Sequence, residues 1–437
     1  MSGTGAIIFS APASGSGKTV ITMGAIAAWR RRGMRVAAAK AGPDYIDTAF
    51  LSAAAGAPAV NLDPWAMRRG LLHSLVQACA DDADLLAIEG VMGLFDGAAG
   101  GAGSTAELAR ALGAPVVLVV DAGRQGQSVA ALAHGFRSFD AGIDVAGVIL
   151  NRVAGGRHER LLRAALEAAG IAVLGAVPRH RAIALPSRHL GLVQAGESEA
   201  LGRTIDEAAR LVGSHVDLDR LAALALAPAR GSVESGGGVA PPGQRIALAS
   251  DQAFGFVYEH VLAGWRREGA EIHPFSPLAD EAPDPAATAV VLPGGYPELH
   301  AGRLAAARVF LDGLAGAARR GATIHGECGG YMVLGEGLVD GKGARHRMAG
   351  LLGLETSFAA RMLSLGYRRA IALADQAFAA PGTVFRGHEF HHATVLSEHG
   401  RPLFAVSDVE GHDLGHSGLA AGRVAGSFVH LIDVEAG

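Results

Sequence analysis

The sequence predicts two doubly wound, three-layer α/β domains joined by a linker. The chain has 437 residues, more than one hydrophobic core ordinarily serves, so two or three units are expected. Half of the residues are hydrophobic and 18% are charged, a balance typical of globular enzymes with buried helices and strands. In both halves short apolar runs alternate with helix-like segments, which predicts mostly parallel sheets that bind ligands at the carboxyl ends of their strands.

In the first half, apolar runs bounded by Gly, Asp or Asn are interpreted as buried strands. These runs are residues 5–12, 35–42, 84–90, 115–123, 146–153 and 171–178. Helix-like segments lie between them at residues 20–33, 104–113 and 158–170. The order of strand and helix predicts one continuous parallel sheet.

A linker is predicted at residues 229–244, which are rich in Gly, Ser and Pro and have no sustained periodicity. It separates a predicted domain at residues 1–228 from another at residues 245–437. Strands of the second domain are predicted at residues 245–251, 271–277, 288–295, 322–327, 383–390 and 423–433.

Charge and cysteine content restrict the class of protein. The formal net charge is −4, so no global basic field attracts nucleic acid or an anionic membrane, and neither partner is expected. No uninterrupted apolar stretch reaches the roughly 18 residues that span a bilayer. Cys79 and Cys328 are too few for a disulfide framework, and Cys79 is expected to be a buried structural thiol. We expect a cytoplasmic protein.

A phosphate-binding loop is predicted directly after the first strand. Its sequence ends in Gly-Lys-Thr before a helix-like segment, although Pro12 stands where the first Gly of the pattern is usual. Backbone N–H groups would surround the phosphates, Lys18 would neutralise β/γ oxygens, and Thr19 would bind Mg²⁺. A simple Gly/Ser-rich connection is the alternative. The predicted ATP-binding residues of this loop are Ser14, Gly15, Ser16, Gly17, Lys18 and Thr19.

Acidic residues follow other predicted strands of the first domain. Asp44, Asp47 and Glu89 are candidate Mg²⁺ ligands together with Thr19, because Mg²⁺ prefers oxygen ligands. Helix caps and turns are open alternatives, particularly for Asp44 and for Asp96. Asn151 ends another strand and is a candidate for reading the nucleotide base, with a turn role equally open.

Cys328 is a candidate nucleophile because it lies where a predicted strand turns into a helix. The helix N-terminus would lower the pKa of the thiol. His430, near the end of another predicted strand, is the candidate base. Gly294, Gly295 and Gly329 are the predicted oxyanion and glutamine-binding positions. Taken singly, a buried core thiol and a hydrogen-bonded histidine are the plainer interpretations.

The cluster at residues 387–393, which contains His388, Glu389, His391 and His392, invites comparison with a metal site. It lacks the helical His-Glu-x-x-His spacing, and strand alternation would send His388 and His391 to opposite faces. We therefore favour a role in the wall of a site or in substrate recognition over zinc binding.

Several of these segments together resemble the family of cobyrinic acid and hydrogenobyrinic acid a,c-diamide synthases of corrinoid biosynthesis. The similar segments are residues 11–19, 40–50, 89–97, 251–260, 292–300, 326–335, 386–390 and 426–431. They extend from the first predicted strand to the last. The resemblance implies a P-loop NTPase-like domain related to dethiobiotin synthetase, followed by a class I glutamine amidotransferase-like domain.

The resemblance also implies an activity. Glutamine would be hydrolysed at Cys328 with His430 as base, and the ammonia would amidate the c and then the a carboxylate of the corrinoid, activated by ATP as an acyl phosphate. ATP and glutamine would be co-substrates, and Mg²⁺ the cofactor. Lys18, Thr19, Asp44, Asp47 and Glu89 match the family's nucleotide or magnesium positions. Lys40 is assigned to ATP binding, and Tyr45 and Asp96 to the substrate or its activation.

One position departs from ordinary class I glutaminases. A Glu usually stands two residues after the catalytic His, and here that position is Ile432. Asp433 is one residue further and would point the other way on a strand. The corrinoid subfamily resembles this chain in that absence.

Several points stay open at this level. The corrinoid could be cobalt-free hydrogenobyrinate, which we favour, or cobalt-containing cobyrinate. Cobyric acid synthase is a nearby rival, and a regulatory P-loop ATPase fused to an inactive amidotransferase-like module is a more distant one. A homodimer is expected. The candidate groups for binding the substrate carboxylates are Arg152, Arg179, Arg181, Arg188, Arg361 and His388.

Overall fold

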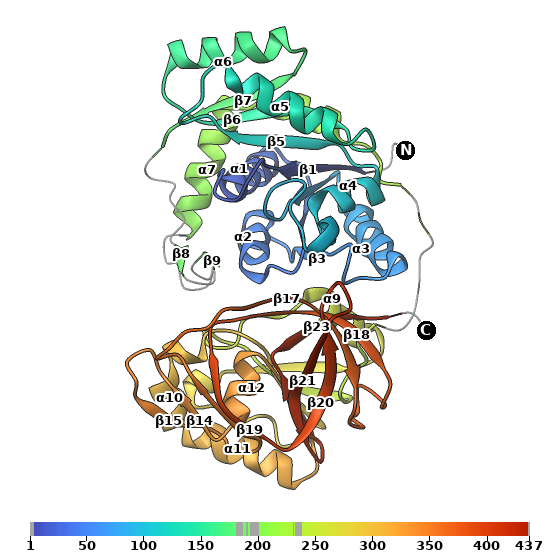
Figure 1. Ribbon diagram of the computed structural model, residues 1–437, viewed down its shortest axis with the longest axis vertical. Helices are drawn as coiled ribbons and strands as arrows, with labels where there is room; N and C mark the ends of the chain where they lie inside the picture. The colour runs from blue at the N-terminus through green and yellow to red at the C-terminus, as the bar shows by residue number, and fades with distance from the viewer. Residues whose placement is uncertain are drawn as a thin grey trace. The chain divides into compact units, whose positions relative to one another are not determined.

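The computed structural model describes residues 4–180, 201–229, 231 and 238–435, and the backbone of residues 187–188 and 191–192 (Figure 1). The chain divides into two compact units. Unit 1 comprises Met1–Trp65 and Arg69–Ser235, and unit 2 comprises Ala66–Arg68 and Gly236–Gly437. Residues 230 and 232–237 of the predicted linker lie outside the described residues, and the linker and the boundaries at 228 and 245 stay a prediction.

Unit 1 is built on a seven-stranded sheet in which all neighbouring strands are parallel. In spatial order the strands are β3 (Val60–Leu62), β2 (Val36–Ala41), β4 (Leu85–Glu89), β1 (Gly5–Ser10), β5 (Val116–Asp121), β6 (Val145–Val153) and β7 (Val173–Pro178). The chain winds outward from β1 in both directions, so right-handed crossovers place helices on both faces. The doubly wound prediction is confirmed for this unit.

The helices of unit 1 connect these strands or follow the last of them. They are α1 (Lys18–Arg31), α2 (Tyr45–Ala55), α3 (Arg69–Asp81), α4 (Thr105–Leu112), α5 (Ser128–Phe139), α6 (Gly156–Ala168), α7 (Leu201–His215) and α8 (Leu218–Leu224), with a 3₁₀ turn at Ala99–Gly101. The sequence missed β3, whose three residues are too few to form a recognisable apolar run. A short pair, β8 (Ser187–Arg188) and β9 (Gly191–Leu192), lies between β7 and α7.

Unit 2 contains a ten-stranded mixed sheet. In spatial order it comprises β11 (Glu271–Phe275), β10 (Arg245–Ala249), β12 (Ala289–Leu292), β13 (Thr323–Glu327), β22 (Val424–Ser427), β21 (Asp413–Ala421), β20 (Arg401–Ser407), β17 (Ser364–Ala372), β18 (Val384–His391) and β23 (Val429–Val434). The pairs from β11 to β22 are parallel, and those from β22 to β23 are antiparallel. An α/β unit is confirmed, with an antiparallel extension that the sequence did not predict.

Further elements of unit 2 surround this sheet. Its helices are α9 (Glu259–Arg267), α10 (Ala301–Ala306), α11 (Arg308–Arg319) and α12 (Gly329–Leu334), with 3₁₀ turns at Pro277–Ala279 and Pro297–Leu299. A smaller sheet has the order β15 (Arg345–Arg347), β14 (Gly337–Val339), β16 (Gly353–Ser357) and β19 (Thr394–His399). The strands between residues 337 and 421 were largely missed because few of their residues are fully buried, so their hydrophobic pattern is weak.

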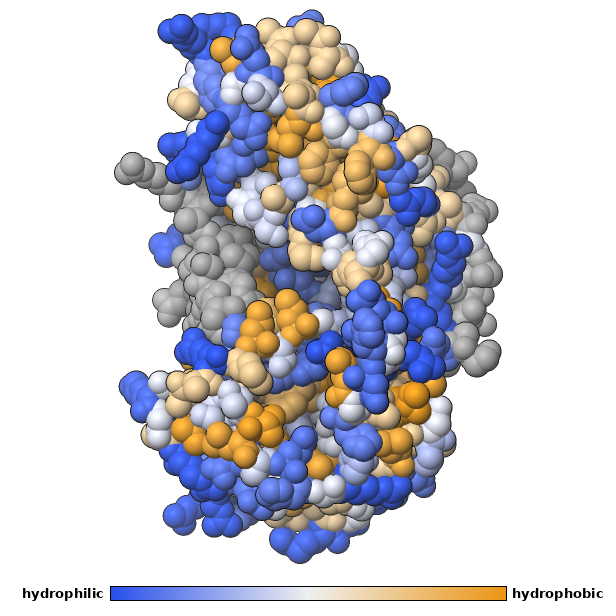
Figure 2. All heavy atoms as spheres, viewed as in Figure 1, coloured by the Kyte–Doolittle hydropathy of each residue, from blue (hydrophilic) through white to orange (hydrophobic). Residues whose placement is uncertain are grey.

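Most of the buried side chains are hydrophobic, as expected for a globular protein. On the face shown in Figure 2, hydrophilic side chains surround small groups of hydrophobic ones. Among the described residues, no helix is both long enough and apolar enough to cross a membrane.

Candidate active sites

The phosphate loop joins β1 to α1, and its geometry leaves the helix N-terminus available to an anion. Gly17 caps α1 with a left-handed φ of 88°, and no side chain caps the helix. A Cβ atom on Gly17 would lie 2.3 Å from Nδ2 of Asn151, so only glycine fits there. The tip of the loop, at Ser14 and Gly15, is exposed. Free N–H groups at a helix N-terminus are the usual way to bind phosphate.

Asn151, near the end of β6, holds this loop in place. Its Nδ2 donates to the Ser16 carbonyl at 2.9 Å, and its Oδ1 accepts from the Arg152 backbone N–H at 2.9 Å. Both ends of the amide are therefore engaged. Each end keeps a second hydrogen-bonding position, a hydrogen on Nδ2 and a lone pair on Oδ1, and the contact with a nucleotide base stays a prediction.

Lys18 is the first residue of α1, and only 8% of it is exposed. Its Nζ donates to the carbonyl of Met92 at 2.8 Å, and Met92 adopts a positive φ of 45° in the loop after β4. Burial, followed by the neighbouring Lys40 ammonium, lowers the pKa of Lys18. A bound polyphosphate would offset both effects, because it brings negative charge to this buried ammonium.

The predicted acidic residues meet around Lys40, at the carboxyl edge of the sheet. Nζ of Lys40 lies 2.6 Å from Oδ2 of Asp47 and 3.1 Å from Oε1 of Glu89. The same Oε1 accepts from the Thr19 hydroxyl at 2.7 Å. Burial lowers the pKa of Lys40, but Asp47 and Glu89 reverse this and leave it raised. Lys40 is therefore a permanent cation within the cluster.

Glu89 is fully buried, and burial, partly offset by Lys40, raises the pKa of its carboxyl. Its second oxygen, Oε2, is buried and has no hydrogen-bond partner among the described residues. An unsatisfied carboxylate oxygen beside the Thr19 hydroxyl suits a cation ligand, because leaving it unpaired is costly.

Asp44 and Asp96 have the local roles that the sequence left open as alternatives. Oδ1 of Asp44 caps α2 by accepting from the Asp47 N–H at 2.8 Å. Burial and the adjacent Asp47 raise the pKa of Asp44 to about 7. Oδ2 of Asp96 accepts from the Gly93 N–H at 3.0 Å and so closes the loop after β4. Tyr45 begins α2, next to Asp44.

Asn61 on β3 belongs to this centre and was missed because β3 itself was missed. Its Nδ2 donates to the carbonyls of Gly42 and Asp44 at 2.8 and 2.9 Å. It therefore fixes the connection between β2 and α2.

A cavity of about 630 Å³ opens near the carboxyl ends of β5, β6 and β7. It is lined by Asp121, Gly123, Arg124, Gln125, Arg152 and Arg179. Arg152 and Arg179, two of the predicted carboxylate-binding groups, thus meet in unit 1, and Arg152 forms an ion pair with Asp121. Arg361 is exposed in unit 2. Arg181 and the side chain of Arg188 lie outside the described residues.

Cys328 occupies a sharp turn between β13 and α12. Its φ and ψ are 47° and −104°, a sparsely populated conformation that costs about 1–3 kcal/mol and is often found at functional sites. The thiol lies 3.8 Å from the Phe390 carbonyl. Burial, then the Glu298 carboxylate, raises the pKa of the thiol, although the Gly329 N–H acts in the opposite direction.

The sequence predicted a lowered pKa for Cys328, and in this respect the structure differs. The helix that follows has only six residues, and its effect does not overcome the removal of the thiol from water. Cys79, expected to be buried, is half-buried on α3, and burial raises its pKa to about 11. Neither thiol is a thiolate at neutral pH in this state.

The glycines of the predicted oxyanion site approach one another closely. A Cβ on Gly329 would lie 3.1 Å from the backbone nitrogen of Gly295 and 2.8 Å from Cδ of Pro297. A Cβ on Gly294 would lie 2.4 Å from Cε1 and 3.2 Å from Nε2 of His430. The Cys328 turn and His430 are therefore joined through the loop after β12. His430 is the second residue of β23, not near the end of a strand as the sequence suggested.

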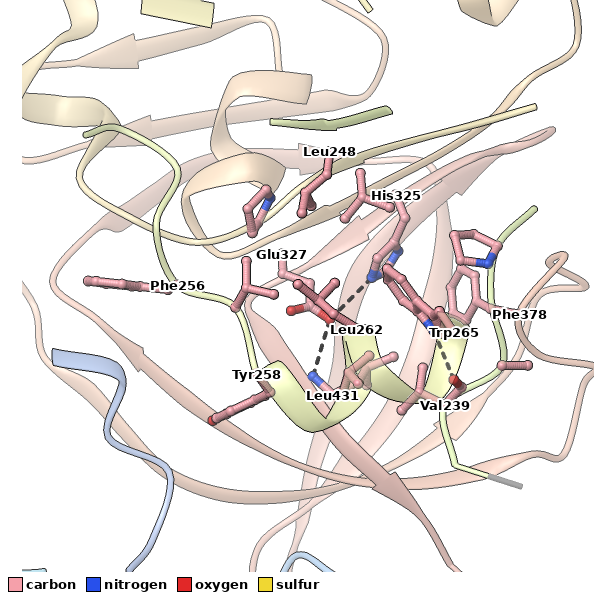
Figure 3. A pocket seen from close by; sticks show the side chains of 16 residues that line it. Val239, Leu248, Phe256, Tyr258, Leu262, Trp265, His325, Glu327, Phe378 and Leu431 are labelled. Atoms are coloured by element: carbon pink, nitrogen blue, oxygen red, sulfur yellow. Dashed lines mark hydrogen bonds and ion pairs between the residues drawn. The ribbon is translucent and has the colours of Figure 1, made fainter. Parts of the chain in front are cut away.

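Glu327, the residue before Cys328, was not singled out from the sequence. Its Oε2 lies 3.6 Å from Nδ1 of His430. Its Oε1 lies 3.3 Å from Nε2 of His325 and accepts from the Leu431 N–H at 3.2 Å. Figure 3 shows these contacts to His325 and Leu431 beside a small cavity with largely apolar walls. The available signal was its position directly before the nucleophile.

Ile432 and Asp433, two and three residues after His430, do not take the place of the usual supporting acid. Ile432 is buried, with 1% exposure. Asp433 is fully buried and forms an ion pair with Arg68, also in unit 2, at 3.0 Å. Asp433 is therefore engaged away from the imidazole, in agreement with the predicted alternation.

The histidine cluster on β18 divides between the two faces of the strand. Nε2 of His391 lies 2.9 Å from Oε1 of Glu389, whose Oε2 accepts from Arg368 at 2.7 Å. His388 instead stands opposite His430 in the β18–β23 register. Burial, then His430 and Arg368, lowers the pKa of His388 to about 3, so it is neutral and unsuited to pair with a substrate carboxylate in this state.

Comparisons with known proteins agree with the two sites. These are the phosphate-loop centre, formed by Lys18 and the acidic cluster around Lys40, and the thiol centre, formed by Cys328, His430 and the glycines around them. Residues 7–193 match the CobQ/CobB/MinD/ParA nucleotide binding domain, and residues 245–435 match the CobB/CobQ-like glutamine amidotransferase domain. The chain is 54% identical over 428 residues to "Hydrogenobyrinate a,c-diamide synthase" of Rhizobium meliloti (strain 1021), covering 98% of this chain and 99% of that protein. The protein of that name from Rhodobacter capsulatus is 53% identical, with 98% of each chain covered.

The chain belongs to the hydrogenobyrinate a,c-diamide synthase family. The predicted resemblance is therefore confirmed over nearly the whole length. The phosphate-loop centre lies within the nucleotide-binding match, and Cys328, Glu327 and His430 lie within the amidotransferase match.

Replacing Gly294 by alanine is expected to lower glutamine hydrolysis at least about tenfold, because the new Cβ would displace the His430 ring. Steady-state release of glutamate measures the effect. Gly264→Ala, on α9, is the matched control, since its Cβ would meet only an arginine tip at 3.9 Å. Equal activity of the two variants would contradict the placement of Gly294 against the base.

Proposed function

We propose that the protein amidates the a and c carboxylates of hydrogenobyrinate, with ATP as the activating substrate and glutamine as the nitrogen donor. The observation that carries this proposal is that one chain contains both a phosphate loop with a buried Lys18 and a strained turn at Cys328. Relatives bearing the name hydrogenobyrinate a,c-diamide synthase align with both over 98% of the chain.

Glutamine is cleaved at the thiol centre. As the Sγ–H proton passes to His430, Sγ of Cys328 attacks the amide carbon and forms a tetrahedral adduct. Backbone N–H groups of Gly295 and Gly329 are the proposed donors to its oxyanion. The amide nitrogen then leaves as ammonia with the proton from His430, and water hydrolyses the thioester to glutamate. The raised pKa of Cys328 means that the thiolate forms only as this proton is transferred.

The phosphate-loop centre activates the acceptor. A substrate carboxylate attacks the γ-phosphorus of ATP, giving ADP and an acyl phosphate, and ammonia then displaces phosphate to leave the amide. Lys18 and the N-terminus of α1 stabilise the charge on the transferred phosphoryl group. Two such cycles convert the c and a carboxylates.

Mg²⁺ fits this centre. Thr19 and Glu89 would hold it, because Oε2 of Glu89 is buried without a partner among the described residues and the Thr19 hydroxyl lies against the same carboxylate. Asp47 and Asp44 are further candidates. When bound, the ion neutralises charge on the phosphate oxygens. Lys40 keeps the acidic cluster together at the same edge.

The choice of corrinoid is tested by mass spectrometry of the products from hydrogenobyrinate and cobyrinate at equal enzyme concentration. We expect the mass of hydrogenobyrinate to change in two steps, each equal to one amidation, and both steps to depend on ATP and glutamine. Conversion of the cobalt-containing cobyrinate should be at least about tenfold slower. Faster conversion of cobyrinate would overturn the choice of substrate. Products amidated at other side chains would favour a cobyric acid synthase.

A regulatory ATPase with an inactive amidotransferase-like module is the more distant candidate. The strained Cys328 turn, the adjacent glycines and the contact of Glu327 with His430 all favour a working glutaminase over it. A homodimer and a cytoplasmic location stay predictions.

A further inference from the structure

The thiol centre, formed by Cys328, His430 and the glycines around them, contains a partly buried carboxylate that the usual arrangement of class I glutaminases does not explain. Glu327 ends β13 and directly precedes the nucleophile. Its two oxygens contact different histidines, Oε2 with Nδ1 of His430 at 3.6 Å and Oε1 with Nε2 of His325 at 3.3 Å. The backbone N–H of Leu431 also donates to Oε1 (Figure 3). The Glu327 side chain is thus hydrogen-bonded to the backbone of Leu431, the residue that follows the proposed base His430.

These contacts keep Glu327 charged and in place. Although burial raises its pKa, the neighbouring His325 and His430 imidazoles reverse this and bring it to about 2. The side chain of Glu327 is 17% exposed and that of His325 only 7%. His325 packs against Phe378, with ring centroids 4.5 Å apart. A carboxylate held from both sides in largely apolar surroundings interacts strongly with a neighbouring cation.

The two ring nitrogens of His430 face different groups. Nδ1 is on the side of Glu327, whereas a Cβ built on Gly294 would come within 3.2 Å of Nε2. Gly294 precedes the proposed oxyanion donor Gly295. A carboxylate at Nδ1 selects the tautomer with hydrogen on that nitrogen, which leaves Nε2 as the acceptor on the side of the reaction.

We propose that Glu327 is the positioning residue of the glutaminase and fills the role of the acid missing at Ile432. It orients His430 through Nδ1 and stabilises the imidazolium that forms when Nε2 takes the proton of Cys328. His325 in turn holds the carboxylate of Glu327. The supporting acid therefore comes from the strand that carries the nucleophile, not from the strand that carries the base. This inference rests on the proposed glutaminase function.

Glu327→Gln tests the role with little change of shape. Glutamate release should show a kcat lowered by about 10²- to 10⁴-fold, the upper end being the loss seen when a triad acid is replaced, with a KM for glutamine changed less than about threefold. The acidic limb of kcat/KM should move to lower pH, because the imidazolium loses its partner charge. A structural role would not move that limb.

Two further variants make the result specific. Glu327→Asp keeps the charge on a shorter side chain and should keep the wild-type acidic limb with a smaller loss of kcat. Glu355→Gln makes the same chemical change at an ion pair with Arg345 on the smaller sheet, and should leave glutamate release unchanged. Amidation supported by ammonium, which bypasses the thiol centre, shows whether each variant is folded.

The outcomes separate this inference from the proposed function. Wild-type kcat and an unmoved acidic limb in Glu327→Gln would overturn it, as would a raised KM with unchanged kcat, which would make Glu327 a glutamine-binding residue. The inference would also be overturned if Glu327→Gln and Glu327→Asp lost the same amount of kcat and showed the same shift of the acidic limb of kcat/KM. If the wild type releases glutamate but amidates no corrinoid, the proposed function falls and the role of Glu327 is still decided.

Discussion

Replacement of Cys328 by alanine is expected to abolish amidation with glutamine, by at least about 10³-fold, while amidation with ammonium continues near the wild-type rate. The physical reason is that Cys328 supplies the only proposed nucleophile for glutamine, whereas ammonium needs none. Parallel assays of diamide formation with each nitrogen source measure the difference.

Cys79→Ala is the matched control for this experiment. Cys79 is half-buried on α3 of unit 1, with a pKa raised to about 11, and plays no part in the proposed chemistry. It should retain both activities. Full glutamine-dependent amidation by Cys328→Ala would show that the nucleophile has been misassigned.

Replacement of Lys18 by alanine is expected to lower amidation by about 10²- to 10⁴-fold with either nitrogen source. The change removes a buried ammonium from the N-terminus of α1, so charge on the transferred phosphoryl group loses its main protein partner. Rates of ADP release and of diamide formation, measured with ammonium, report this step without the glutaminase.

Lys342→Ala controls for loss of a lysine, since Lys342 is exposed in the turn between β14 and β15. It should behave as the wild type. Glutamate release should also continue in Lys18→Ala. Survival of ammonium-supported amidation in Lys18→Ala would contradict the assignment of the ATP site.

Much of unit 1 could be predicted because its strands are buried on both faces. Runs such as those of β1, β4 and β5 are almost wholly buried, so they are continuous in the sequence, and β4 ends in the candidate ligand Glu89. The antiparallel strands of unit 2 are less buried, and residues 423–433, predicted as one strand, form β22 and β23 with a break at Phe428. Partial burial weakens the pattern on which strand prediction depends.

The acidic cluster shows where prediction from residue type stops. Asp44, Asp47 and Glu89 were recognised as oxygen ligands, but a sequence cannot tell a ligand from a helix cap. Asp44 caps α2 and Asp47 pairs with Lys40, whereas Glu89 is the one of these three with a buried oxygen that has no partner among the described residues. Neighbours distant in the chain decide the role of each.

The sequence by itself determined the α/β class, the two chemical centres, the family, and Lys18, Cys328 and His430 as candidates, because these depend on local patterns of burial and on short motifs. Only the tertiary structure decided that burial raises the pKa of Cys328 and that Asn151 holds the phosphate loop. It also brought Glu327 to His430, 3.6 Å apart. Such relations depend on strands paired across long stretches of chain, and spacing in the sequence does not record which side chains those pairings bring together.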